Sequence, residues 1–253
     1  MRRAWLALVA ALAIGGAAHG ETLIVTLSTS EVQIASNFTG DSVAVFGAIE
    51  PDAGAGPLAG DYDVVVVLKG PDQDVVTRRK EHFLGVWVNR ASATLRDLPA
   101  FYAAHSTRPL GEIADLETLR QLELGMDNIA IEPAEALDPG TAFDFALAFR
   151  RLKAEDGLYV EAAPAVIRVG ASVFQTNFVL PAHIPIGEFE ARVYLFRAGA
   201  LVNEAGGTLT VSKTGFEQLL FVAAQRQPLL YGAAAVVLAL LIGWLAGVIF
   251  RRD

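Results

Sequence analysis

Hydrophobic and polar residues alternate along much of the chain, a pattern typical of β-strands with one buried face. Near the start, Leu23, Val25 and Leu27 alternate with threonine, isoleucine and serine, and a period of two returns between Ser42 and Ile49. The chain is therefore predicted to be mostly β. Further short runs of the same kind cover residues 75–80, 83–88, 166–169, 172–180, 188–196 and 201 onward.

One run does not alternate. The valines from Val64 to Val67 are consecutive and β-branched, and Gly60 and Gly70 bound the segment that contains them. Such a run is too short for a typical helix, so it is predicted to be a strand covered on both faces.

Helical signals concentrate in the middle of the chain. A proline in the first turn indicates a helix start at residues 98–105, and apolar residues recur at every third position within residues 113–122. Asp138 followed by a proline opens a stronger helix that ends at Gly157. Residues 97–157 are therefore predicted to be a helical connection between two β-rich segments.

An internal repeat relates those two β-rich segments. Residues 40–51 match residues 170–181 at a constant offset of 130, and residues 60–68 match residues 187–195 at an offset of 127. The loops between the matched stretches differ in length by three residues, which accounts for the change of offset. The pattern indicates a duplicated unit.

Regular short strands favour an immunoglobulin-like β-sandwich for each copy. The first sandwich is expected over residues 21–96 and the second over residues 158–213, joined by the helical connection of residues 97–157. No cysteine pair or tryptophan spacing marks a true immunoglobulin domain, so the prediction concerns architecture alone.

The last long segment has the composition of a transmembrane helix. Residues 229–250 contain no charged side chain, and at ~1.5 Å per residue this run is about 30 Å long, enough to cross the hydrocarbon core. Residues 214–228 are predicted to be an amphipathic juxtamembrane helix. Residues 251–253, with two arginines, form a short tail.

The N-terminal residues 1–20 have the pattern of a secretory signal peptide, with two arginines before an apolar stretch and small residues near Gly20. We expect cleavage after Gly20; an uncleaved N-terminal anchor is the alternative. The arginines that follow the C-terminal helix belong on the inner side. The expected location is the inner (cytoplasmic) membrane, with the ectodomain in the periplasm and the C-terminus in the cytoplasm.

Composition narrows the class of partner. The chain has a formal net charge of −8 and no cysteine. An acidic protein is a poor ligand for nucleic acid, and without disulfides an exported domain depends on its hydrophobic core. The expected partners are the membrane and either an integral membrane protein or a second copy of the chain.

The C-terminal helix carries the only candidate site residues. Ala235, Ala239, Gly243 and Gly247 recur at every fourth position, so they line one stripe where another helix can approach closely. Small residues are common in membrane helices, and a chance match is the alternative. We assign these four residues as a candidate helix-packing site.

No pattern identifies an enzyme, a cofactor or a metal site. His82, His105 and His183 belong to different segments, and neither a G-x-S-x-G nor a phosphate-loop motif occurs. The basic side chains of residues 150–153 indicate either an anion site or, more commonly, a solvated helix face near a C-terminus. Trp87 is expected to be a core or sheet-edge aromatic rather than a ligand platform.

Several short motifs are combined in this chain: Gly85-Val-Trp87, Leu98-Pro-Ala-Phe-Tyr102, Gly157-Leu-Tyr159, Leu180-Pro-Ala182, Tyr194-Leu-Phe-Arg197 and Pro228-Leu-Leu-Tyr-Gly232. Together they resemble the uncharacterised alphaproteobacterial single-span transmembrane protein family. The resemblance covers nearly the whole mature chain and implies no activity. It does imply an accessory role, because members of that family are encoded beside sulfite-exporter-like permeases.

The main hypothesis is a non-enzymatic, periplasm-facing, single-pass membrane protein that binds a protein partner, with a sulfite-exporter-like permease as the partner that the resemblance implies. Two alternatives stay open. One is a periplasmic small-anion binder or enzyme whose site lies between the two β segments, near residues 97–157. The other is a self-associating envelope protein.

Overall fold

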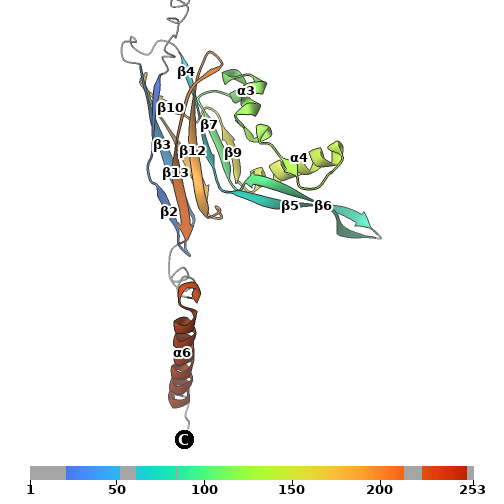
Figure 1. Cartoon of the computed structure of the whole chain (residues 1–253), viewed down its shortest axis with the longest axis vertical. Helices are drawn as coiled ribbons and strands as arrows, with labels where there is room; N and C mark the ends of the chain where they lie inside the picture. The colour runs from blue at the N-terminus through green and yellow to red at the C-terminus, as the bar shows by residue number, and fades with distance from the viewer. Residues whose placement is uncertain (1–20, 52–60, 84, 214–223, 250–253) are drawn as a thin grey trace, which may run out of the picture.

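The computed structural model describes residues 21–51, 61–83, 85–213 and 224–249. Strands dominate the body of the molecule, as the alternation predicted (Figure 1). The predicted signal peptide, the tail and residues 214–223 of the predicted juxtamembrane helix lie outside the described residues.

Two sheets pack face to face and enclose the core. The four-stranded sheet has, in spatial order, β1 (Thr22–Leu27), β3 (Gly40–Glu50), β11 (Val173–Pro181) and β10 (Ile167–Val169). The six-stranded sheet has, in spatial order, β2 (Glu31–Ile34), β13 (Ala200–Lys213), β12 (Gly187–Arg197), β4 (Tyr62–Lys69), β7 (Tyr102–Ser106) and β9 (Tyr159–Ala162).

Each of these sheets contains strands from both β-rich segments. Strand β3 pairs with β11, and β4 pairs with β12, both in antiparallel fashion. The expectation of one sandwich over residues 21–96 and another over residues 158–213 differs from this arrangement, and the strand orders do not establish an immunoglobulin-like sandwich. Alternation specifies which face of a strand is buried, but it does not specify the neighbouring strand.

The internal repeat has a counterpart in the pairing of the strands. Val66 and Val193, which are equivalent in the repeat, face each other in the β4–β12 ladder. In the β3–β11 ladder, Val45 faces Thr176, the neighbour of its equivalent Gln175. Because each ladder is antiparallel and centred on equivalent positions, an approximate two-fold axis relates the repeated strands.

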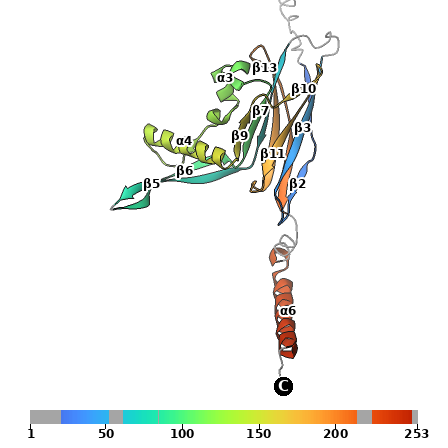
Figure 2. The same cartoon turned by 180° about the vertical axis from the view of Figure 1, so that it is seen from behind.

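Strand β4 confirms the prediction made from the consecutive valines. Every residue from Tyr62 to Leu68 is buried. One face of β4 packs against the four-stranded sheet, and α3 (Leu116–Gln121) and α4 (Pro139–Glu155) lie on the other side of the six-stranded sheet (Figures 1 and 2). Both faces are therefore removed from water.

The connection of residues 97–157 is only partly helical. Residues 98–105, predicted to start a helix, instead end a strand and form most of β7, whose five side chains are all buried. Pairing with β4 outweighs the local helix signal. The remaining elements are α2 (Leu110–Ile113), α3, the 3-10 turn η1 (Met126–Asn128), β8 (Glu132–Pro133) and α4.

Helix α4 forms where the sequence predicted it. The Asp138 carboxylate accepts a hydrogen bond from the Thr141 backbone N–H at 3.0 Å and caps the helix, with Pro139 as its first residue. Gly157 follows the C-terminal end with a φ of 68°, a left-handed conformation that favours glycine.

A long hairpin leaves the body. Strands β5 (Asp72–Phe83) and β6 (Val86–Pro99) pair along their length, and β8 pairs with β6. Figures 1 and 2 show the end of this hairpin extending beyond α4. Trp87 lies near that end and is 70 % exposed, so it is not a core residue.

Helix α6 (Pro228–Ile249) confirms the predicted C-terminal helix. Within the described part of the chain it is the one helix long and apolar enough to cross a membrane, with a mean hydropathy of 2.3 over Pro228–Ala246.

Candidate functional site

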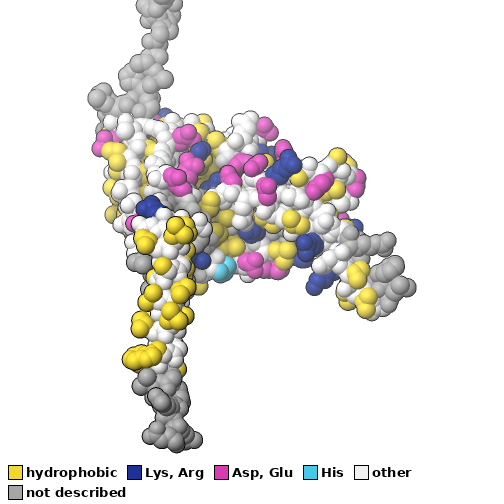
Figure 3. All heavy atoms as spheres, turned by 60° about the horizontal axis from the view of Figure 1, so that its bottom comes forward, with side chains coloured by type: hydrophobic (Ala, Val, Ile, Leu, Met, Phe, Trp, Pro, Cys, Tyr) yellow, Lys and Arg dark blue, Asp and Glu magenta, His cyan; other side chains and the backbone are white. Residues whose placement is uncertain are grey.

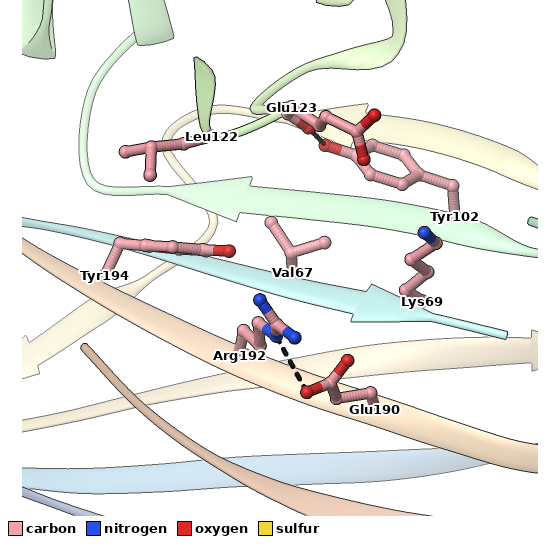
Figure 4. A pocket seen from close by; sticks show the side chains of 8 residues that line it. All are labelled: Val67, Lys69, Tyr102, Leu122, Glu123, Glu190, Arg192 and Tyr194. Atoms are coloured by element: carbon pink, nitrogen blue, oxygen red, sulfur yellow. Dashed lines mark hydrogen bonds and ion pairs between the residues drawn. The ribbon is translucent and has the colours of Figure 1, made fainter. Parts of the chain in front are cut away.

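A small cavity lies on the outer face of the six-stranded sheet, where β4, β7 and β12 meet the chain after α3 (Figure 4). Its volume is about 100 Å³. The cavity lies beside the repeated strands β4 and β12 and near residues 97–157, the region of the alternative site considered from the sequence, and that site stays a prediction. The lining residues are Val67, Lys69, Tyr102, Leu122, Glu123, Glu190, Arg192 and Tyr194.

Two of the polar groups in the cavity are held by neighbours. Arg192 Nε donates to Glu190 Oε1 at 2.7 Å, and this hydrogen bond raises the pKa of Arg192, which stays charged. The Tyr102 hydroxyl donates to the Glu123 carbonyl at 2.9 Å and accepts from the Gly125 N–H at 2.8 Å. Burial raises the pKa of Tyr102, so its hydroxyl is a neutral hydrogen-bonding group.

A larger hollow of about 360 Å³ adjoins this cavity and shares Lys69 and Glu190 with it. We call the two together the sheet groove. Its charged lining consists of two cations, Lys69 and Arg192, and four carboxylates, from Asp72, Glu123, Glu188 and Glu190. The excess of carboxylates disfavours a small anion and favours a cationic or zwitterionic ligand.

The basic residues of α4 do not converge on an anion site. The Arg150 guanidinium donates to the carbonyls of Met126 at 3.0 Å and of Asp127 and Ile129 at 3.2 and 3.0 Å. Its three bonds fasten α4 to the η1 turn. Arg151 lies 3.7 Å from Glu155 on the same helix.

Lys153 also attaches α4 to the body of the molecule. Its Nζ donates to the Ala100 carbonyl at 3.1 Å and lies 5.8 Å from the centroid of the Phe149 ring. Burial lowers the pKa of Lys153. Arg150 and Lys153 therefore attach α4 to the body, whereas Arg151 pairs within the helix.

The three histidines of the described residues lie apart. His82 packs edge-on to Trp87 with ring centroids 5.4 Å apart, and His183 Nε2 lies 2.9 Å from the Asp156 carbonyl oxygen. Within the described residues, no group of three histidine, cysteine, aspartate or glutamate side chains is placed to hold a metal ion.

His105 lies in the core between the two sheets. Its ring stacks on Phe178 at a centroid distance of 4.2 Å, and its Nδ1 is 2.7 Å from Thr176 Oγ1. Because the Thr176 hydroxyl donates to the Ala165 carbonyl, it accepts from His105 Nδ1. Burial lowers the pKa of His105, so the ring is a neutral part of the core.

The outer face of the four-stranded sheet is exposed and free of charge across its centre. Two rows of side chains cross all four strands in the register of the ladders. We call these two rows the open face. One row is Ile24, Ala48, Val173 and Val169, and the other is Thr26, Phe46, Gln175 and Ile167.

Large apolar side chains of the open face are in contact with water. The exposed fraction is 48 % for Ile24, 60 % for Ile167 and 55 % for Val169. Figures 1 and 2 show no described helix or strand over this side of the sheet. Contiguous exposed apolar surface of this kind marks interaction sites.

Sequence reasoning missed the open face, although a signal was present. Strand β1 has isoleucine at position 24, among the outward positions that alternation assigns to polar residues, and β3 has Phe46 in the same situation. A strand whose outward positions lack charge predicts a covered face, and here no described element covers it.

The predicted helix-packing residues lie on α6. Ala235, Ala239 and Gly243 occur at intervals of four in a continuous helix, which places them on one face. A methyl group added at Gly243 would meet no atom within 4 Å. Gly247 also belongs to the helix. The four residues therefore form one stripe along the backbone.

Comparison with protein families agrees with this architecture. The family model described as "Putative transmembrane protein (Alph_Pro_TM)" matches residues 22–252. The chain belongs to this family. The match confirms the resemblance to alphaproteobacterial transmembrane proteins and, with α6, is consistent with a single-pass membrane protein. None of the curated proteins compared with this Alph_Pro_TM member matches it.

Proposed function

We propose that this Alph_Pro_TM member is a non-enzymatic membrane-anchored protein that binds a protein partner through the open face. The observation that carries the proposal is the pair of uncharged rows across all four strands of one sheet. Burying such a face removes apolar area from water without desolvating a charge. An interface core has this composition.

The same proposal gives α6 a second contact. The stripe Ala235, Ala239, Gly243 and Gly247 lets another transmembrane helix approach closely, and van der Waals packing then stabilises the pair. The body lies in the periplasm and α6 crosses the inner membrane, with its C-terminal end inside. An integral membrane transporter of the permease type could meet both surfaces at once.

Co-purification from native membranes tests the proposal. We expect the tagged wild-type protein to bring down an integral membrane protein, and Phe46→Lys with Val173→Lys to lose it. Gly243→Leu with Gly247→Leu should also weaken recovery, because larger side chains separate the helices. A matched control is Gln33→Lys with Thr210→Lys, which adds the same charge at exposed positions of the other sheet.

The result distinguishes the proposal from self-association. Two differently tagged copies that recover each other, with no other protein present, would instead identify a homo-oligomer. Recovery that is equal for the wild type and the open-face variant would contradict the role of the open face.

A second candidate function is binding of a small polar molecule in the sheet groove. The four carboxylates and two cations of the groove favour an amine or a zwitterion over an anion such as sulfite. Calorimetric titration of the full chain in detergent with putrescine, glycine betaine and sulfite tests this. Heat with sulfite alone would contradict the charge argument, and Glu190→Gln should weaken any binding of putrescine.

A further inference from the structure

The end of the β5–β6 hairpin combines exposed apolar side chains with cations. Val86 is 57 % exposed and Trp87 is 70 % exposed. Gly85, with a φ of 86°, allows the chain to reverse direction there. No charged residue occurs between His82 and Asn89, so the end of the hairpin is an apolar tip.

Residues 78–81 behind this tip are Arg, Arg, Lys and Glu, so three basic side chains outnumber one carboxylate there. Arg78 and Lys80 are exposed on β5, and Lys80 is two residues from His82, which packs against Trp87. Side chains two apart on a strand share a face, so Lys80 and the His82–Trp87 pair lie on one face. Figure 3 shows Lys and Arg side chains, in dark blue, gathered beside the end of the hairpin.

We infer that the tip of the β5–β6 hairpin inserts into the interfacial layer of an anionic lipid membrane. Tryptophan at headgroup depth with lysine or arginine nearby is the composition of interfacial anchors. The basic residues behind the tip contrast with the net charge of −8 of the whole chain. That contrast fits anionic headgroups, which the rest of the acidic surface repels.

The size of the tip favours a lipid surface over a protein partner. A tryptophan buries about 150–250 Å², whereas a stable protein interface needs about 800 Å² from each partner. Val86 and Trp87 cannot supply that area on a narrow two-stranded projection. Insertion into lipid needs no such area, and α6 keeps a bilayer within reach.

The hairpin is long, and its end projects past the contacts that hold its base. Strand β5 has 12 residues, which at ~3.3 Å per residue is about 40 Å. Helix α4 supports the hairpin as far as Arg79, the eighth of the 12 residues of β5, which lies 3.8 Å from Asp144. The supported base and the projecting tip together make a rigid second contact with the membrane, separate from α6.

A fluorescent label on the full chain tests the inference. The chain has no cysteine, so Val86→Cys provides a single attachment point for an environment-sensitive dye. The labelled protein is placed in vesicles of phosphatidylglycerol and phosphatidylcholine that carry a nitroxide near the headgroups. Reference labels at Leu230→Cys in α6 and at Glu117→Cys on α3 define the quenched and unquenched limits.

We expect the Val86→Cys dye to shift to shorter wavelength and to be quenched in vesicles with phosphatidylglycerol. Quenching should fall in phosphatidylcholine alone, and Lys80→Gln should lower the equilibrium constant for insertion about fivefold. A dye that stays unquenched while Leu230→Cys is quenched overturns the inference. A wavelength shift that occurs only when a second membrane protein is present in the vesicles also overturns the inference, and it points to docking on protein.

Discussion

The two sheets of the body differ most in what lies on their outer faces. The chain from residue 107 to residue 157 crosses the six-stranded sheet, and the buried strand β4 and the sheet groove are the result. The four-stranded sheet has no described element on its outer side (Figures 1 and 2), and its central rows are uncharged.

The outer face of the six-stranded sheet is therefore used for packing within the chain, whereas the outer face of the four-stranded sheet is available for binding. On the covered side, apolar side chains are buried and polar groups form hydrogen bonds within the chain, as Arg150 and Tyr102 show. On the open side, comparable apolar residues have no partner element within the described chain. An exposed face of that kind is expected to be covered by another molecule.

Adjacent residues of β11 give the largest expected effect. Phe178 is fully buried between the sheets, whereas Val179 is 72 % exposed on the outer side. We expect Phe178→Ala to lower the free energy of unfolding by about 3–5 kcal/mol, and Val179→Ser to change it by about 0.5 kcal/mol or less. Denaturant unfolding of both variants in detergent measures the pair, and equal losses would mean that Val179 is not on an open face.

The second-largest expected effect on stability concerns the attachment of α4. Arg150→Ala removes three hydrogen bonds to the carbonyls around η1, and we expect a loss of about 2 kcal/mol in the free energy of unfolding. Arg151→Ala is the matched control, because its exposed pairing with Glu155 contributes under about 0.5 kcal/mol. If the two variants were equally stable, α4 would not be fastened through Arg150.

Removal of one hydroxyl should have a smaller effect. Tyr102→Phe leaves the Glu123 carbonyl and the Gly125 N–H without a partner, and we expect a loss of about 1–2 kcal/mol. Tyr159→Phe removes a single hydrogen bond, to the Pro99 carbonyl, and should cost less. Thermal unfolding of the two variants under one condition tests that order.

The smallest effect is a dependence on pH through His105. Burial lowers its pKa below the unfolded value of about 6.5, so the unfolded state binds the proton first on acidification. This contribution to stability is complete above about pH 6.5 and is lost as the pH falls towards the lowered pKa of the folded state.

One variant isolates that contribution. His105→Gln should reduce the slope of stability against pH below about pH 6.5. Unfolding curves between neutral and mildly acidic pH provide the slope. An unaltered slope in His105→Gln would mean that the ring does not titrate differently on folding.

Local patterns predicted the elements that depend on local physics. Alternation located most strands, the consecutive valines predicted the double burial of β4, and Asp138 with Pro139 marked the start of α4. The uncharged run ending at residue 250 predicted α6. Each of these features depends on residues close together in the chain.

Features that depend on distant pairing were beyond the sequence patterns. Residues 98–105 were predicted to start a helix, but most of them form β7 because they pair with β4. The repeat indicated duplication but not that equivalent strands would pair with each other, as Val66 and Val193 do. The sheet groove and the open face likewise arise from registers that no single strand encodes.

The measurement that tests the central claim most directly is site-specific photocrosslinking in native membranes. The cysteine-free chain permits one benzophenone label at Val173→Cys on the open face and, in a second preparation, at Glu117→Cys on α3. We predict adducts with a membrane protein from Val173→Cys and few from Glu117→Cys. Equal yields from both positions, or none from Val173→Cys, would contradict a binding role for the open face.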